Sequence, residues 1–135
     1  MKKSDIKNSS DMFLYKAIVD LNSAKCLLAA FDNNEIEIDV EKIYFELQQS
    51  AEKILKSLLS RQNTIFPKCH DIGFLIDLCL ETNIKLSDNV SILVELSDYT
   101  VDGRYSMIHD DINESEKYII TIENLIGIAK AMSEK

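Results

Sequence analysis

The chain contains few residues that interrupt helices: three glycines and one proline occur among its 135 residues, and tryptophan is absent. A turn-rich all-β fold needs such residues at frequent intervals, so their scarcity argues against one. Charged residues interrupt every long apolar stretch, which excludes a membrane-spanning helix from the sequence. The cysteines Cys26, Cys69 and Cys79 form no Cys-x-x-Cys pair, so we expect buried or half-buried free thiols instead of a zinc ribbon or redox pair.

Motifs for bound metals and cofactors are also missing. The sequence has no glycine-rich phosphate loop and no His-Glu-x-x-His spacing, so we expect neither a metal ion nor a cofactor. The first residues carry lysines but no apolar stretch follows them, and a secretory signal peptide is therefore not predicted. A cytoplasmic location with no membrane partner is the expectation.

Charge is distributed unevenly along the chain. The net charge is −8, made up of −3 over residues 1–41, +3 over residues 42–70 and −8 over residues 71–135. An acidic surface repels a polyanion except at a focused basic site, so a nucleic-acid coat protein is disfavoured. The central basic segment predicts either such a focused site or ordinary solvated helix faces.

Apolar residues recur at intervals of three and four over most of the chain, the spacing of helices that bury one face. The pattern predicts an all-α, up-and-down antiparallel bundle of four to five helices, in a single domain covering residues 1–135. Ser10, Asp39 and Asp71 are the expected N-caps of the first three helices. The five expected helices are 10–31, 39–62, one following Asp71, one from Ser87 or Asp88 to near Val101, and one from Asn113.

Two of these helices carry a specific expectation about which residues face inward. In the third helix the apolar set includes Leu80, and in the fourth the inward set is Ile92, Leu93, Leu96 and Tyr99. Both sets assume the α-helical period of 3.6 residues.

A polar strip runs along the second helix. Gln48, Glu52 and Lys56 follow one another at i, i+4 spacing and share one face. On residue types alone, the strip is a solvent-exposed face with a Glu52–Lys56 pair contributing about 0.3 kcal/mol.

Arg104 and His109 are separated by four residues, close behind Gly103. An arginine can hold a phosphate through two parallel donors, and a histidine can transfer a proton near neutral pH, so the pair suits phosphodiester chemistry without a metal. The alternative is an arginine that pairs with a nearby aspartate beside a surface histidine. The second histidine, His70, precedes a helix start, where a structural hydrogen bond or packing against the neighbouring helix is expected.

Three stretches, in this order, resemble the HEPN domain family. Residues 44–56 contain Gln-Gln-x-x-Glu-Lys-x-Leu-Lys, residues 66–72 contain a Pro-x-x-His-Asp connection, and residues 99–105 end in Arg-Tyr after a tyrosine. The resemblance covers roughly residues 40–110. It implies a helical bundle that pairs into a homodimer.

The resemblance also implies an activity. Active members of the family carry an Arg-x(4–6)-His motif at the dimer cleft and cut RNA without a metal, leaving a 2′,3′-cyclic phosphate. Carried over, Arg104 and His109 are the catalytic residues, with Tyr105, Lys53 and Lys56 on the substrate. The implied role is the toxin half of a toxin–antitoxin pair, with a nucleotidyltransferase as the cognate antitoxin.

A second interpretation remains open, in which the chain is a non-catalytic nucleotide-binding module or a nucleotidyltransferase partner. Many toxin members have a tyrosine two positions after the histidine, where this chain has Asp111. The family's proline after Arg-Tyr is Ser106 here.

Overall fold

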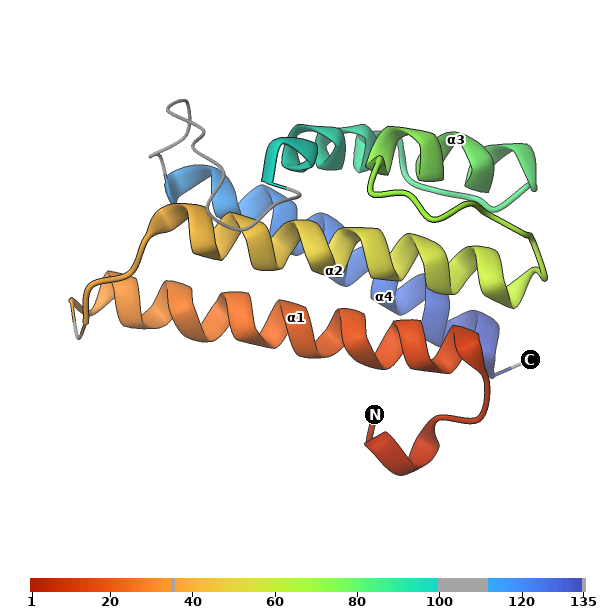
Figure 1. Ribbon diagram of the computed structural model, residues 1–135, viewed down its shortest axis with the longest axis horizontal. Helices are drawn as coiled ribbons and strands as arrows, with labels where there is room; N and C mark the ends of the chain where they lie inside the picture. Colours follow the sequence, from red (N-terminus) through yellow and green to blue (C-terminus); the bar gives the residue numbers. More distant parts are fainter. Residues whose placement is uncertain (35, 100–111, 135) are drawn as a thin grey trace.

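The computed structural model describes residues 1–34, 36–99 and 112–134, and every regular element in those ranges is a helix (Figure 1). This confirms the predicted all-α bundle. No helix within the described ranges is both long and apolar enough to cross a membrane. The elements are α1 (Ser9–Asp32), α2 (Val40–Arg61), α3 (Ile72–Glu81), the 3-10 helix η2 (Asp88–Tyr99) and α4 (Ser115–Ser133), with short 3-10 turns η1 (Lys3–Asp5) and η3 (Ile112–Glu114).

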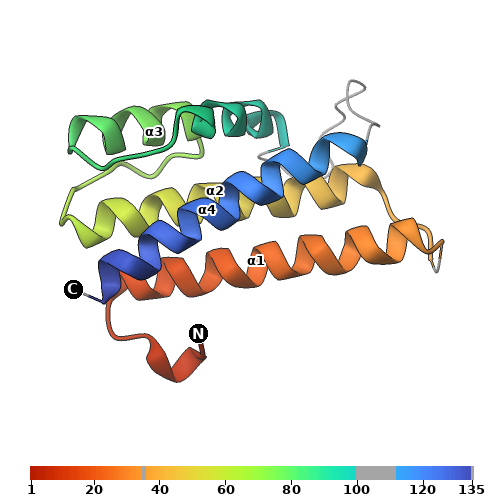
Figure 2. The ribbon, with the colours of Figure 1, turned by 180° about the vertical axis from the view of Figure 1, so that it is seen from behind.

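Helix α2 lies at the centre of the bundle and contacts α1, α3, η2 and α4. Figure 1 shows α1 on one side of α2 and the α3–η2 layer on the other, and Figure 2, seen from the opposite side, shows α4 crossing in front of the α1–α2 pair. The rings of Tyr44 and Tyr118 meet edge to face, with centroids 5.9 Å apart, and join α2 to α4. The side chains of α2 that are fully enclosed include Ile43, Leu47, Ala51, Ile54, Leu55 and Leu58.

Two of the three expected N-caps are confirmed. The side chains of Asp39 and Asp71 accept hydrogen bonds from backbone N–H groups in the first turns of α2 and α3. The prediction for Ser10 is wrong, because Asn8 caps α1. Ser10 is buried, and its hydroxyl donates to the backbone carbonyl of Ser57 on α2 at 2.8 Å.

Asparagines take the place of glycine at the C-terminal ends of three helices. Asn34, Asn63 and Asn83 have φ values of 53°, 57° and 64°, and each follows the C-cap residue of α1, α2 or α3. Glycine usually occupies this left-handed position, and asparagine is the common substitute. After α2 the chain turns back so that the N–H of Thr64 donates to the carbonyl of Leu59 at 2.9 Å.

The fourth helix differs from its prediction because it is a 3-10 helix. Three residues per turn place Val90, Leu93 and Leu96 on one line, and all three are buried. Ile92 is half-buried and packs against the core, in agreement with its predicted inward facing, while the side chain of Tyr99 lies outside the described ones. Of the apolar residues predicted on α3, Leu80 is 52% exposed and the others are buried.

Candidate functional site

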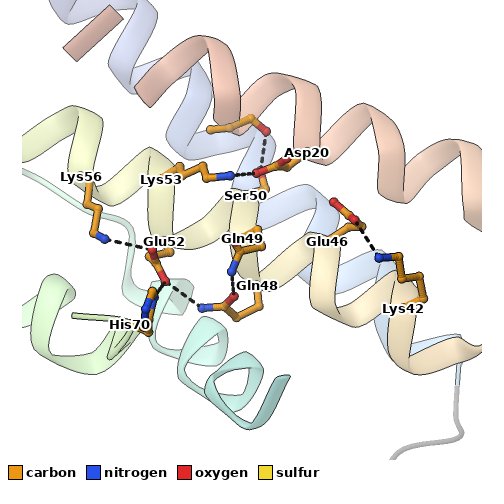
Figure 3. Close-up of polar contacts among 11 residues, drawn as sticks. Asp20, Lys42, Glu46, Gln48, Gln49, Ser50, Glu52, Lys53, Lys56 and His70 are labelled. Carbon is orange, nitrogen blue, oxygen red and sulfur yellow. Dashed lines mark hydrogen bonds and ion pairs between the residues drawn. The ribbon is translucent and has the colours of Figure 1, made fainter. Parts of the chain in front are cut away.

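Five site residues are predicted from the sequence, and the structure describes two of them. Arg104, Tyr105 and His109 lie outside the described residues. Lys53 and Lys56 lie on α2, where their amines point toward opposite sides of the helix, one to α1 and the other toward the start of α3 (Figure 3). The described part of the candidate site therefore consists of polar residues on α2 and the side chains that contact them.

The carboxylate of Glu52 is the centre of a buried polar cluster. It accepts a hydrogen bond from the Lys56 amine at 2.9 Å and another from the Gln48 amide at 3.1 Å. The Gln49 amide in turn donates to Gln48 at 2.6 Å. Gln48, Glu52 and Lys56 are between 0% and 9% exposed, so the expectation of a solvent-exposed face is wrong for this strip. The reason is tertiary: α3 and η2 pack against α2, and His70 from the preceding connection reaches Glu52.

His70 completes the cluster from outside α2. Its Nδ1 lies 2.8 Å from a Glu52 oxygen, and its side chain is 69% exposed. An ionised carboxylate can only accept, so Nδ1 carries the hydrogen in this contact. This places the second histidine in the structural role expected of it, a hydrogen bond to the neighbouring helix. It also leaves most of the imidazole ring open to solvent.

The environment of Glu52 keeps it charged. Burial alone raises the pKa of a carboxyl group, but the hydrogen bonds from Lys56, His70 and Gln48 and the charge of Lys56 outweigh burial, so the pKa of Glu52 lies below its ordinary value. The carboxylate of Glu52 is thus held by three donors. A buried charge needs such partners to offset the cost of its removal from water.

A second polar cluster lies on the other side of α2, against α1. The Lys53 amine donates to Asp20 at 2.6 Å, and Lys42 lies 3.7 Å from Glu46. Burial and the nearby charge of Asp20 raise the pKa of Glu46, and Lys42 and Lys53 oppose that rise without cancelling it. These side chains are more open than Glu52 and Lys56, with Lys53 at 23% and Asp20 at 17% exposed.

Sequence reasoning missed Asp20 as the partner of Lys53. The two residues are 33 positions apart, and no spacing within either helix relates them. The i, i+4 rule found the Glu52–Lys56 pair because both lie on one helix. It carried no information about burial, which depends on the segments that cover α2.

Lys53 and Lys56 each have a carboxylate partner already, so neither site lysine presents an uncompensated positive charge.

Among the described residues no group of three or more His, Cys, Asp or Glu side chains is arranged to hold a metal ion. The cysteines are all free. Cys79 is buried, and burial raises the pKa of its thiol to about 12, which makes it unreactive. The expectation of a buried or half-buried thiol is wrong for Cys26, which is exposed.

Comparison with protein families matches residues 11–132 to the HEPN domain family. The match spans nearly the whole chain, and the chain therefore belongs to the HEPN domain family, a family of helical bundles. The Gln48-Gln49-x-x-Glu52-Lys53 helix and the His70-Asp71 connection, which suggested the resemblance, are the segments that meet in the Glu52 cluster. No curated protein and no solved structure matches the chain significantly.

Proposed function

We propose that this protein is a metal-independent endoribonuclease of HEPN type that acts as a homodimer in the cytoplasm. The observation that carries the proposal is an intact Arg104-x(4)-His109 pair in a chain that belongs to the HEPN domain family. In this proposal each subunit contributes one arginine and one histidine to a composite site at the dimer cleft. A two-fold axis doubles the positive charge available there, which a single acidic chain lacks.

The proposed chemistry uses both residues in complementary roles. His109 takes the proton from a ribose 2′-hydroxyl, and the resulting oxygen attacks the adjacent phosphorus. The bond from phosphorus to the 5′-oxygen breaks, a histidine returns a proton to that leaving oxygen, and the product ends in a 2′,3′-cyclic phosphate. Arg104 holds the phosphoryl oxygens while negative charge accumulates on them.

The substrate-binding role falls to Tyr105, Lys53 and Lys56 in this proposal. Lys53 is the more accessible of the two lysines, since 23% of its side chain is exposed compared with 11% for Lys56. A phosphate that approaches α2 therefore competes first with Asp20 for the Lys53 amine. Lys56 acts mainly as the counter-charge that keeps Glu52 ionised.

We also propose that the chain is the toxin component of a toxin–antitoxin pair, with a nucleotidyltransferase as antitoxin.

A non-catalytic nucleotide-binding or nucleotidyltransferase-partner role is the second candidate. It is favoured by Asp110 and Asp111, which follow His109 directly and add negative charge where a phosphate would bind. It is also favoured by the carboxylate partners of Lys53 and Lys56.

The test is incubation of the purified protein with RNA in EDTA, followed by analysis of product ends. We expect cleavage with 2′,3′-cyclic phosphate termini, and loss of at least 100-fold in rate, the order of a general acid–base contribution, in Arg104→Ala and in His109→Ala. The chain offers matched controls, because Arg61 and His70 are its other arginine and histidine. Arg61→Ala and His70→Ala should retain the activity below their melting temperatures.

The two candidate functions give different results in the same assay. A wild-type protein that binds a nucleotide but leaves RNA intact over a range of salt concentrations supports the non-catalytic role. Activity that survives in His109→Ala would overturn the assignment of the catalytic pair.

A further inference from the structure

The connection between α1 and α2 forms an open hollow at the end of the bundle opposite the C-terminus (Figure 1). Its volume is about 690 Å³. Phe31 and Ile38 are half-buried and pack against the core, so they form an apolar inner wall. Ile36 is 64% exposed. We call this site the α1–α2 hollow, and its lining is Phe31, Asn34, Ile36, Glu37, Ile38 and Asp39.

Residues 36–39 form a ridge with a hollow on each side. The second hollow has a volume of about 360 Å³ and is lined by the same four residues together with Leu27, Glu41 and Lys42. A peptide segment that lies across the ridge can place one side chain in each hollow. Peptides bound in this manner take their specificity from the pockets that receive successive side chains.

Negative charge is concentrated around the α1–α2 hollow. Residues 32–41 include five acidic side chains and no basic one. Asp39 and Glu41 lie at the N-terminal end of α2, where the helix dipole favours a negative charge. Asp32 lies at the C-terminal end of α1, where the dipole disfavours it and where the last turn has no basic residue. The helices therefore explain Asp39 and Glu41 but not Asp32.

Two of these carboxylates lack a cation. Within the described ranges, Asp32 and Glu37 make neither an ion pair nor a side-chain hydrogen bond. A metal ion does not account for them, since no described group of three or more His, Cys, Asp or Glu side chains could hold one. Nucleic acid and anionic lipid are repelled by the same charge. An apolar wall beside unpaired carboxylates fits a ligand that combines an apolar body with a positive charge.

We propose that the α1–α2 hollow binds an arginine-rich segment of another protein. An arginine side chain joins an apolar stem to a planar, charged group of five N–H donors, so one residue can match both parts of the hollow. The stem packs on Ile36 and Ile38, and the guanidinium pairs with the carboxylate of Glu37. A second basic side chain of the segment pairs with Asp32.

The first experiment locates the site by NMR. The isotope-labelled full chain is titrated with the peptide Arg-Leu-Arg-Leu-Arg, and the backbone amide shifts are followed. We expect the largest shifts within residues 31–41 and none with Glu-Leu-Glu-Leu-Glu. Shifts centred elsewhere, or none at millimolar peptide, overturn the proposal. Shifts of the same amides when the protein is concentrated without peptide would identify a second copy as the occupant and would also overturn it.

The second experiment measures the affinity of the labelled arginine peptide by fluorescence anisotropy. Ile36→Ser removes the exposed apolar contact and should weaken binding about five-fold. Glu37→Gln removes one charge and should weaken it about three-fold. The matched controls are Ile65→Ser, at a residue that is 94% exposed, and Glu81→Gln, at an exposed residue that ends α3.

The two control variants lie outside the α1–α2 hollow and should keep the affinity of the wild type. Equal losses within each matched pair would show a general attraction of a basic peptide to an acidic chain, and they would overturn the proposal. Neither experiment measures cleavage, so its outcome is independent of the ribonuclease assay.

Discussion

Helices α1 and α2 each place a set of side chains where their chemistry is not expected. On α2 a strip of polar residues, Gln48, Glu52 and Lys56, is buried at the centre of the bundle. On α1 an apolar set that includes Val19 and Cys26 is exposed at its edge. The informative departures in any protein are a buried polar group and an exposed apolar patch, and here they occur on two adjacent helices.

The difference lies in how each set is satisfied. The polar set on α2 is complete within the chain, since Glu52 accepts from three donors and keeps a low pKa. On α1, Val19 is 42% exposed and Cys26 is also exposed. A buried polar cluster that is complete needs no ligand to explain it, and a few exposed apolar side chains are ordinary on a protein surface.

The largest expected effect on folding comes from placing an aspartate at a buried apolar position of α2, and an exposed apolar position of α1 provides the comparison. Leu47 is fully buried on α2, and Leu47→Asp puts an unpaired carboxylate into the core, so we expect the helical circular dichroism signal to be lost. Val19→Asp places the same carboxylate on the exposed face of α1 and should keep the full helical signal. A folded Leu47→Asp protein would show that the core facing of α2 is wrong.

The next effect comes from breaking the polar cluster. Glu52→Leu leaves Lys56 buried without its counter-charge and should lower the free energy of unfolding by about 3 kcal/mol, measured by urea denaturation. The double variant Glu52→Leu/Lys56→Met removes both charges and should recover most of that loss.

The Asp20–Lys53 pair provides the matched comparison. It is more open to solvent, so Lys53→Met should cost about 1 kcal/mol or less. Equal losses for Glu52→Leu and Lys53→Met would show that burial does not distinguish the two clusters.

The smallest effect is a difference in pH dependence between Glu52 and Glu46. The folded-state pKa of Glu52 is lowered, so its contribution is fully present above the ordinary value of 4.5 and is lost as the pH falls through the folded-state pKa. The stability deficit of Glu52→Gln should therefore be largest near pH 6 and shrink below pH 4.5. Urea denaturation between pH 6 and pH 3 measures it.

Glu46 should show the opposite sign. Its folded-state pKa is raised by burial and by Asp20, so its ionised form costs stability at pH 6, and that cost disappears as the pH falls toward 4.5. Glu46→Gln should accordingly be slightly stabilising at pH 6 and neutral in acid. A deficit for both variants at pH 6 would contradict the assigned pKa directions.

The helices themselves could be predicted closely from local patterns. The first predicted helix, 10–31, is observed as Ser9–Asp32, and the second, 39–62, is observed as Val40–Arg61. The apolar spacing and the capping aspartates act within a few residues of each other, so the sequence contains the relevant information. The errors occur where the period changes, as in the 3-10 helix η2, and at the start of α1, where Asn8 caps the helix and the Ser10 hydroxyl donates to α2 instead.

The candidate site was less accessible to prediction. Lys53 and Lys56 could be named from the Gln-Gln-x-x-Glu-Lys motif, but their partners Asp20 and Glu52 set their charge environment. Asp20 reaches Lys53 from another helix, and His70 reaches Glu52 from the connection before α3. These contacts join residues distant in sequence, and no local spacing encodes them.

The sequence by itself determined that this chain is helical, where most helices begin and end, and which family its motifs resemble, because these properties depend on short-range periodicity and residue type. Only the tertiary structure decided that the polar strip of α2 is buried and that Val19 and Cys26 of α1 are exposed. For both helices the sequence alone shows which residues share a face. Which face is covered depends on the chain segments that pack against it, and those segments are brought there by the fold of the whole bundle.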